Sequence, residues 1–211
     1  MQKIDFATWP RAELFRFFSA VSDPFYSVTF RVDVTNLHAY TKAHGISFYY
    51  ALCYLAADAV NAVENFRYTI RDGEIFLLDG RIPSFTDLKP DSEQFHIVTL
   101  PKTGTLYEFC RAAKAKSDAQ QSFLDQSGVL DDLIYFSCLP WMDVTAVTNE
   151  RDLLAPNARD DSIPRICWGK YTLENERVYL GISVEVNHRL IDGVHIGRFA
   201  EALTRRIQAL K

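Results

Sequence analysis

The sequence predicts an α/β protein, an α+β two-layer sandwich in which a mixed β-sheet packs against helices. Segments with the period of two that is typical of strands lie at 26–34 and 178–186, and an apolar run at 133–139 also predicts a strand. Helical periodicity separates them, and the helix at 47–65 is apolar almost all round, as in a buried helix. With 211 residues and no break in composition, we expect a single domain, 1–211.

The composition argues against several classes of partner. The chain has 23 Lys and Arg against 27 Asp and Glu, a net charge of -4, and no basic run that interleaves with aromatics. Nucleic acid and an anionic membrane are therefore not expected as partners. The N-terminus lacks an apolar signal core, and the longest apolar run, at 48–57, is too short to span a bilayer. We expect a soluble, cytoplasmic protein with a small-molecule site.

The cysteines and histidines do not form metal motifs. No C-x-x-C pair or neighbouring histidine pair is present, which argues against zinc and against a disulfide framework. We therefore expect no metal. Each cysteine lies among apolar residues, so reduced, structural thiols are expected, with a cysteine nucleophile as the alternative. The four are Cys53, Cys110, Cys138 and Cys167.

The first segment of the chain predicts a short helix. Proline at position 10 precedes the aromatic run at 14–18, which is typical of a helix opened by proline in its first turn. Arg11 lies in this aromatic company and could be a surface arginine whose stem covers Trp9. After the strand at 26–34, Thr35 and Asn36 offer a cap for another short helix.

The middle of the chain predicts hairpins and one further helix. Asp72-Gly73 is a two-residue hairpin signal within 66–78, and we expect a meander on an antiparallel or mixed sheet there. A polar stretch at 87–94, after the 83–86 motif, leads to a short strand at 95–100 and a helix at 105–119, and 118–132 is expected to be a loop with a helical remnant. The strand at 133–139 is stopped by Pro140 and contains one hydroxyl, Ser137.

The most specific stretch is 186–193, where a strand ends and a helix begins. The alternation through 178–186 continues to His188 and places it on the apolar side. Desolvation there lowers the pKa of the imidazole and keeps it neutral near pH 7, the form that a general base needs. A packed core histidine is the alternative. Asp192 suits the N-cap before Gly193, and it could orient the ring or hold the turn by pairing with an arginine.

The same stretch carries a resemblance to known acyltransferases. The run N-H-R-L-I-D-G at 187–193 resembles the C-terminal H-x-x-x-D-G signature of the chloramphenicol acetyltransferase family. The acyltransferase domain of the 2-oxo acid dehydrogenase complexes shares that signature. The first family fits better over the whole chain, because further motifs match it in order and at similar spacing, at 9–11, 32–35, 47–49, 59–61, 66–67, 83–86, 137–141 and 170–171.

The resemblance implies an acetyl-coenzyme A (acetyl-CoA)-dependent O-acetyltransferase with the fold of coenzyme A-dependent acyltransferases. His188 is then the general base that activates an acceptor hydroxyl for attack on the thioester. Ser137 matches a serine that donates to the oxyanion, and the alternative from the residues alone is a strand serine bonded to backbone. Asp192 and Arg11 match a buried salt bridge, so Asp192 becomes an anchor of the loop rather than a relay.

The resemblance also implies a homotrimer with its sites between subunits. His188 would come from one chain and the acceptor pocket around Tyr26 from its neighbour. Trp141 resembles a residue beside the coenzyme channel, and a tryptophan that closes a core is the alternative. Lys170 could approach the coenzyme phosphates or be an ordinary surface lysine.

Several positions depart from the family pattern. Asn187 replaces the first histidine of an H-H pair, which is not the catalytic one. Cys167 stands where many members have a threonine that helps to hold an active-site water, and Tyr135 and Glu185 replace polar residues near the site. The region 95–137 matches poorly. The acceptor therefore stays open between chloramphenicol and another alcohol or amine, and a non-catalytic trimer with the same fold is the alternative outside enzymes.

Overall fold

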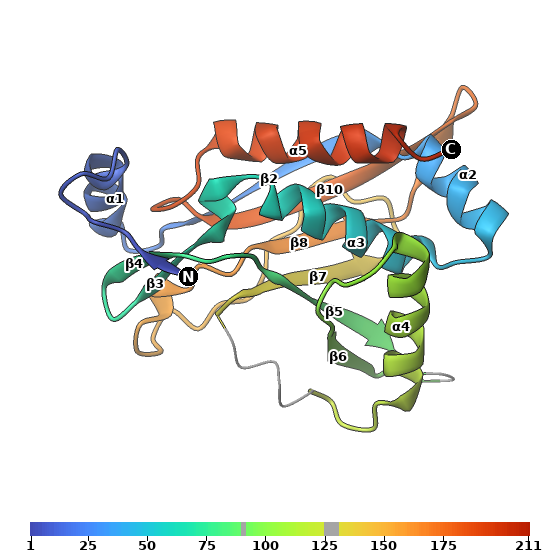
Figure 1. The fold of residues 1–211 in the computed structure, drawn as a ribbon, viewed down its shortest axis with the longest axis horizontal. Coiled ribbons are helices and arrows are strands. Elements are labelled where there is room, and N and C mark those ends of the chain that lie inside the picture. The colour runs from blue at the N-terminus through green and yellow to red at the C-terminus, as the bar shows by residue number, and fades with distance from the viewer. Residues whose placement is uncertain (90–91, 125–130) are drawn as a thin grey trace.

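A computed structural model describes residues 1–89, 92–124 and 131–211. It contains a mixed sheet with a layer of helices on one face, which confirms the predicted fold class (Figure 1). The strands follow the order β2 (Phe25–Asp33), β10 (Arg177–Asn187), β8 (Arg165–Gly169), β7 (Leu133–Leu139), β5 (Ile82–Leu88) and β6 (Phe95–Thr99), and β9 (Thr172–Glu174) adds to β10. The pairs β5–β7 and β7–β8 are parallel, and the other pairs of these strands are antiparallel.

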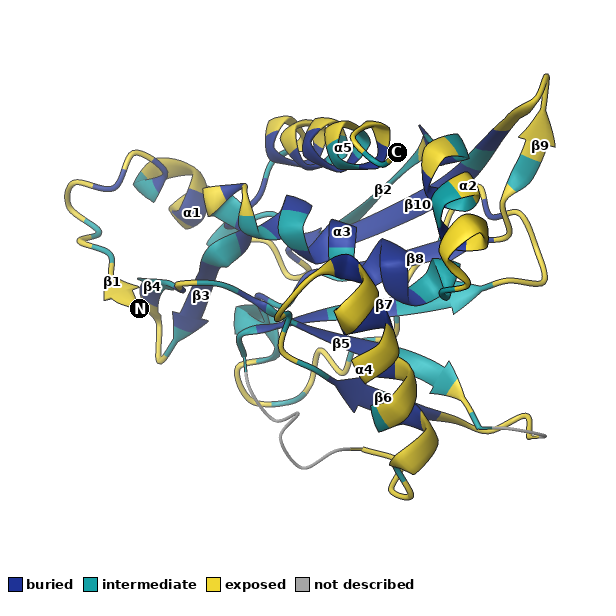
Figure 2. Cartoon of the chain, turned by 45° about the vertical axis from the view of Figure 1, so that its right-hand side comes forward, coloured by how far each residue is buried: buried dark blue, intermediate teal, exposed yellow. Residues whose placement is uncertain are grey.

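The helix layer consists of α2 (Thr35–His44), α3 (Phe48–Asn61), α4 (Leu106–Ala119) and α5 (Gly193–Gln208). α3 contacts the other three helices and is buried over most of its length, as its all-round apolar sequence predicts (Figure 2). The Ser47 hydroxyl caps it by accepting a hydrogen bond from the Tyr50 N–H. Alternate strand residues such as Phe136 and Trp168 complete this core.

The N-terminal part forms a separate small sheet beside α1 (Ala12–Ser19). β1 (Gln2–Lys3), β4 (Glu74–Leu77) and β3 (Tyr68–Arg71) pair in that order. The hairpin at Asp72-Gly73 forms as expected, with both residues at positive φ, but its strands do not join the main sheet. The 3₁₀ turn η1 (Glu64–Arg67) lies directly before β3. The two strands that the Asp72-Gly73 turn joins thus lie in a small antiparallel sheet with β1.

The segment after Arg81 contains a strand that the sequence pattern does not predict. β5 lies inside the sheet between β6 and β7, although Pro83, Ser84 and Thr86 give it a polar, broken appearance. The buried Ser84 hydroxyl is satisfied within the sheet, because it accepts a hydrogen bond from Thr99 at 3.0 Å. Polar residues can therefore occupy a central strand when they are paired across it.

The remaining connections are irregular. The expected helical remnant within 118–132 falls partly on 125–130, outside the described residues. Beyond β7, the chain crosses the sheet face opposite the helices and forms the 3₁₀ turn η3 (Ala158–Asp160) before β8. No helix among the described residues is both long and apolar enough to cross a membrane.

Candidate active site

His188 lies one residue beyond the end of β10, in the loop that leads into α5. Its N–H donates to the Pro24 carbonyl at 2.8 Å, which extends the β2–β10 pairing. The Phe18 ring of α1 stacks on the imidazole with centroids 3.8 Å apart, and the Tyr26 ring lies 4.3 Å away on a tilted plane. The sequence therefore placed the histidine correctly at the strand-to-helix junction, and the structure surrounds it with aromatic rings.

The environment of His188 favours the neutral imidazole. Burial lowers its pKa below the ordinary value of 6.5, the Arg11 charge lowers it further, and Asp192 opposes both. About a third of the side chain remains exposed. The ring is thus neutral at pH 7 and accessible, which is what a proton acceptor requires and a fully packed core histidine lacks.

Tyr26 contacts His188 of its own chain. Tyr26 is paired with Val186 across the β2–β10 register, and His188 follows Val186 by two residues. The side chains of Tyr26 and His188 therefore lie on the same face of the sheet. The Tyr26 hydroxyl donates to the Ile191 carbonyl at 3.2 Å, and burial followed by the Asp192 charge raises the pKa of the phenol to about 12. The expectation that Tyr26 reaches the histidine from a neighbouring chain is therefore wrong.

Arg11 binds the His188 loop at three points. Its guanidinium pairs with both carboxylate oxygens of Asp192, with Nη2 to Oδ1 at 2.6 Å, and donates to the carbonyls of His188 at 2.7 Å and Arg189 at 2.8 Å. Arg11 is only 7% exposed, so the reading as a surface arginine is wrong. Bidentate pairing of this kind fixes geometry as well as charge.

The Asp192 carboxylate binds the Arg11 guanidinium more closely than the His188 imidazole. The Arg11 hydrogen bond lowers the pKa of Asp192, so the carboxylate is ionised at neutral pH. Its distance to His188 Nε2 is 3.5 Å, longer than the contacts to Arg11. Asp192 also occupies the N-cap of α5, where its N–H donates to His195 Nδ1 at 2.9 Å. The geometry favours an anchor over a relay.

Ser137 and Cys167 lie on the opposite face of the sheet from the helices. Ser137 is paired with Cys167 across β7–β8, Cys167 with Ser183 across β8–β10, and Ser183 with Thr29 across β2–β10. This polar row is five residues from His188 along β10, so Ser137 and His188 lie roughly 20 Å apart at ordinary strand spacings. Among the described residues, no hydrogen bond joins Ser137 to His188.

The four cysteines are free thiols. Burial raises the pKa of Cys110 and Cys138 to about 12, and it raises those of Cys53 and Cys167 as well. A Ser137 hydrogen bond partly opposes the shift at Cys167. Protonated thiols are poor nucleophiles, so the chemistry of a cysteine nucleophile is not favoured. Nowhere in the described part of the chain do three His, Cys, Asp or Glu side chains converge as metal ligands.

Trp141 follows β7 and is 65% exposed, with Met142 beside it also exposed. The alternative that Trp141 closes a core is therefore wrong. Lys170 is exposed at the end of β8, and its N–H donates to the Met142 carbonyl at 2.7 Å. Both side chains are free to meet a molecule that binds over this end of the sheet.

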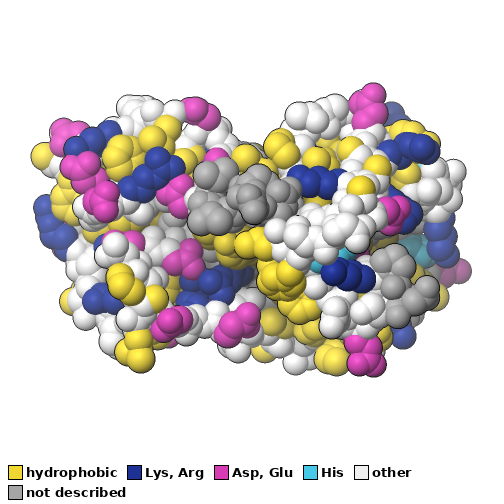
Figure 3. Space-filling model, turned by 90° about the horizontal axis from the view of Figure 1, so that it is seen from below, with side chains coloured by type: hydrophobic (Ala, Val, Ile, Leu, Met, Phe, Trp, Pro, Cys, Tyr) yellow, Lys and Arg dark blue, Asp and Glu magenta, His cyan; other side chains and the backbone are white. Residues whose placement is uncertain are grey.

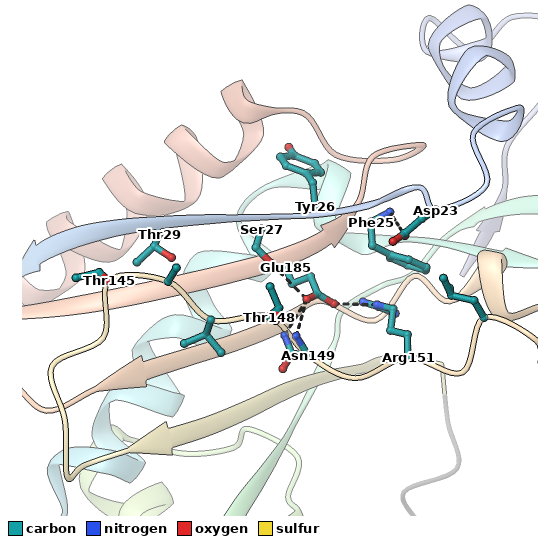
Figure 4. A pocket seen from close by; sticks show the side chains of 13 residues that line it. Asp23, Phe25, Tyr26, Ser27, Thr29, Thr145, Thr148, Asn149, Arg151 and Glu185 are labelled. Atoms are coloured by element: carbon teal, nitrogen blue, oxygen red, sulfur yellow. Dashed lines mark hydrogen bonds and ion pairs between the residues drawn. The ribbon is translucent and has the colours of Figure 1, made fainter.

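A cavity of about 650 Å³ lies over the polar face of β2 and β10. Phe25, Ser27 and Thr29 line it from β2, and the crossing segment at 145–151 closes its other side (Figure 4). The Tyr26 side chain projects to the other side of β2 from Ser27. A cavity of this volume is in the range of small-molecule sites.

Glu185 forms the charged wall of this cavity. Its carboxylate accepts hydrogen bonds from the Asn149 N–H at 3.0 Å and Nδ2 at 3.1 Å, and from Arg151 Nε at 2.8 Å (Figure 4). Burial opposes ionisation, but these donors still hold the pKa of Glu185 below its ordinary value. The departure from the family pattern at position 185 therefore places an ionised carboxylate, paired with the Arg151 guanidinium, against the cavity.

Sequence reasoning missed Phe18 and Arg151. Arg11, Phe15 and Phe18 follow the i, i+4, i+7 spacing of one helix face, and this signal could have placed Phe18 beside the loop that Arg11 binds. Arg151 carried no such signal, because it lies in an irregular segment and reaches Glu185 only through the tertiary fold.

Comparison with solved structures defines the class of the fold. A chloramphenicol acetyltransferase superposes with a TM-score of 0.86 at 24% identity, and the alignment covers 100% of both chains. The dihydrolipoamide acetyltransferase of Azotobacter vinelandii superposes with a TM-score of 0.68 at 18% identity, covering 93% of this chain and 88% of that one. The chain thus has the fold of these acyltransferases.

Sequence comparison then gives the family. The family model described as Chloramphenicol acetyltransferase matches residues 1–204, and the chain belongs to this family. Chloramphenicol acetyltransferase 3 of Escherichia coli is 29% identical over 206 residues, which cover 95% of this chain and 94% of the relative. A chloramphenicol acetyltransferase of Clostridium perfringens is also 29% identical, over 99% of both chains. The protein is an acyltransferase, and the recognition made on the 187–193 signature is confirmed.

Proposed function

We propose that the protein transfers the acetyl group of acetyl-CoA to a hydroxyl of a small acceptor, with His188 as general base. The observation that carries this proposal is the neutral, partly exposed imidazole held by Phe18, Tyr26 and the Arg11-bound loop. Acetyl transfer is what the names of its relatives state. Because acetyl-CoA is made and used inside cells, we place the reaction in the cytoplasm.

The proposed reaction proceeds in one ternary complex. The imidazole takes the proton of the acceptor hydroxyl while its oxygen attacks the thioester carbonyl. The Ser137 hydroxyl donates to the oxyanion of the tetrahedral intermediate. The intermediate collapses to the acetyl ester as the carbon–sulfur bond breaks, and the coenzyme A thiolate takes the proton back from the imidazolium. These steps use a base, a hydrogen-bond donor and a thioester, and they call for no metal ion.

We further propose that the site forms between subunits of a homotrimer. His188 and Ser137 lie roughly 20 Å apart within one chain, too far to act on one acetyl group, so the two must come from different chains. Exposed apolar side chains support association: Trp141, Met142 and Leu154 in the connection between β7 and β8, and Phe95 and Phe123, which pack together. Figure 3 shows hydrophobic side chains gathered near the middle of the molecule's lower surface.

For the acceptor, the relatives' names favour chloramphenicol, and the cavity beside Glu185 has room for a molecule of that kind. One observation favours a different alcohol or amine: the cavity wall carries the ionised Glu185–Arg151 pair. A charged wall disfavours an apolar group and suits an acceptor rich in hydrogen-bonding groups. We assign Trp141, Cys167 and Lys170 to the binding of the coenzyme.

The test is thiol release from acetyl-CoA with chloramphenicol and with a panel of other alcohols and amines. We expect release with at least one acceptor and its loss in His188→Ala. His44→Ala is the matched control, because His44 is exposed, on α2, and stacks only on Tyr40. Undiminished turnover in His188→Ala would refute the mechanism. No release with any acceptor would instead leave a non-catalytic trimer. Growth on chloramphenicol of bacteria that express the protein would show antibiotic resistance.

A further inference from the structure

The residues on both sides of His188 are held by one short segment, residues 159–161, which we call the strap. Asn187 Nδ2 donates to the carbonyls of Arg159 at 2.9 Å and Asp161 at 3.0 Å. Arg189 Nη1 donates to the Arg159 carbonyl at 3.1 Å and pairs with Asp160 Oδ1 at 2.6 Å. The strap thus binds the chain immediately before and immediately after the histidine.

The strap also binds the C-terminal end of α1, through the side chain of Arg159. Arg159 Nη2 donates to the carbonyl of Ser19 and, at 2.6 Å, to that of Val21. α1 in turn carries Phe18, which stacks on His188, and Phe15, whose ring lies 4.3 Å beneath the Arg189 guanidinium. The helix, the strap and the His188 loop are therefore joined to one another by hydrogen bonds and ring contacts beside the imidazole.

Stability alone does not explain Arg189. The side chain is buried, and its Nε has no hydrogen-bond partner among the described residues. Desolvation of a guanidinium costs free energy that one ion pair and one carbonyl bond offset only in part. An apolar residue at this position would fill the same space at lower cost. Such a buried charge is better explained by the geometry it imposes than by the energy it contributes.

Arg189 also acts on a different part of the loop from Arg11. Arg11 holds the backbone carbonyls of His188 and Arg189, together with Asp192. Arg189 fixes the same backbone through its side chain, from the side of the strap. If one of these two attachments is removed, the peptide that follows His188 can rotate about the one that remains.

We infer that Arg189 is a positioning residue for His188: through Asp160 and the Arg159 carbonyl, it fixes the loop so that the imidazole stays against Phe18. This inference rests on the proposed role of His188 as the base. It makes position 189, next to the histidine, a determinant of the rate, although its side chain is buried against Asp160 and Phe15.

Arg189→Ala and Asp160→Asn test the inference, the second without removing the guanidinium. Each should lower kcat on the order of 10-fold to 100-fold, because a small misplacement of a catalytic group is costly. The KM for acetyl-CoA should change little, and Arg189→Lys should recover part of the rate. The matched control is Arg177→Ala, which breaks the exposed Arg177–Asp33 pair at 2.7 Å and should leave kcat unchanged.

An NMR titration of the His188 ring gives a readout that does not depend on turnover. The charged or titratable groups around the ring are Asp192, His195, Arg11 and Tyr26, and all remain in the variants. Release of the ring from Phe18 should move its pKa upward toward the ordinary value and change its resonances.

Three outcomes are distinguishable. A lower kcat with a shifted His188 titration, in a variant that remains folded, supports the inference. Unchanged kcat and unchanged His188 resonances overturn it, as does a lower melting temperature with the rate per folded enzyme and the titration unchanged. If the unmodified protein releases no thiol with any acceptor, the proposed function fails, while the NMR titration still decides whether Arg189 holds the ring. Should Arg189→Ala not fold, Asp160→Asn decides.

Discussion

Replacing Arg11 with alanine removes the group that holds the His188 loop to the N-terminal helix. The change leaves the Asp192 carboxylate without its partner and leaves the carbonyls of His188 and Arg189 without a donor. Breaking a buried ion pair costs about 3–5 kcal/mol. Asp192 is 27% exposed, so water compensates in part, and we expect about 3 kcal/mol. For a chain of this length, that corresponds to a melting temperature about 6–12 °C lower.

The pH dependence of this stabilisation follows from Asp192. Because Arg11 holds the pKa of the folded carboxyl below its ordinary value of 3.8, the ion pair contributes fully above that pH. The contribution is lost as the pH falls through the lower, folded-state value. A melting experiment at pH 7 therefore measures the whole effect of Arg11→Ala, and the difference from the unmodified protein should shrink in acid.

The assay is thermal melting at one protein concentration, since the melting temperature of an oligomer depends on concentration. Activity is measured on the same samples and should fall together with stability. Arg11→Lys keeps the charge but not the bidentate fork, so an intermediate result is expected. Arg177→Ala, which breaks an exposed pair, should change the melting temperature little. An unchanged melting temperature in Arg11→Ala would refute the assignment of the pair as an anchor.

Two further predictions concern the chemistry. Because burial holds the pKa of His188 below 6.5, the neutral base is complete near pH 7, and kcat/KM should rise with pH and level off with a midpoint below 6.5. A midpoint at or above 7 would contradict this. Ser137→Ala should lower kcat on the order of 100-fold with little change in the KM for acetyl-CoA, whereas Ser183→Ala, in the same polar row, should retain activity. Equal losses in both would indicate damage to the sheet instead.

Local patterns are sufficient to predict much of the fold. β10 and α5 follow from a period of two that changes to a helical period at Asp192 and Gly193, and α3 follows from its apolar surface. β5 could not be predicted in this way, because the partner that satisfies its buried Ser84 hydroxyl, Thr99, lies on a neighbouring strand. The hairpin at Asp72-Gly73 shows the same limit: its turn is local, but the sheet that it joins is not.

For the site, the histidine, its strand-to-helix junction and the capping aspartate can be predicted from sequence, because each depends on neighbours within a few residues. The surroundings of the histidine follow from the tertiary structure. Phe18, Tyr26, Arg11 and the strap come from segments far away along the chain, and their contacts arise from strand register and helix packing. A periodic pattern records which face of an element is buried, but not which distant element covers it.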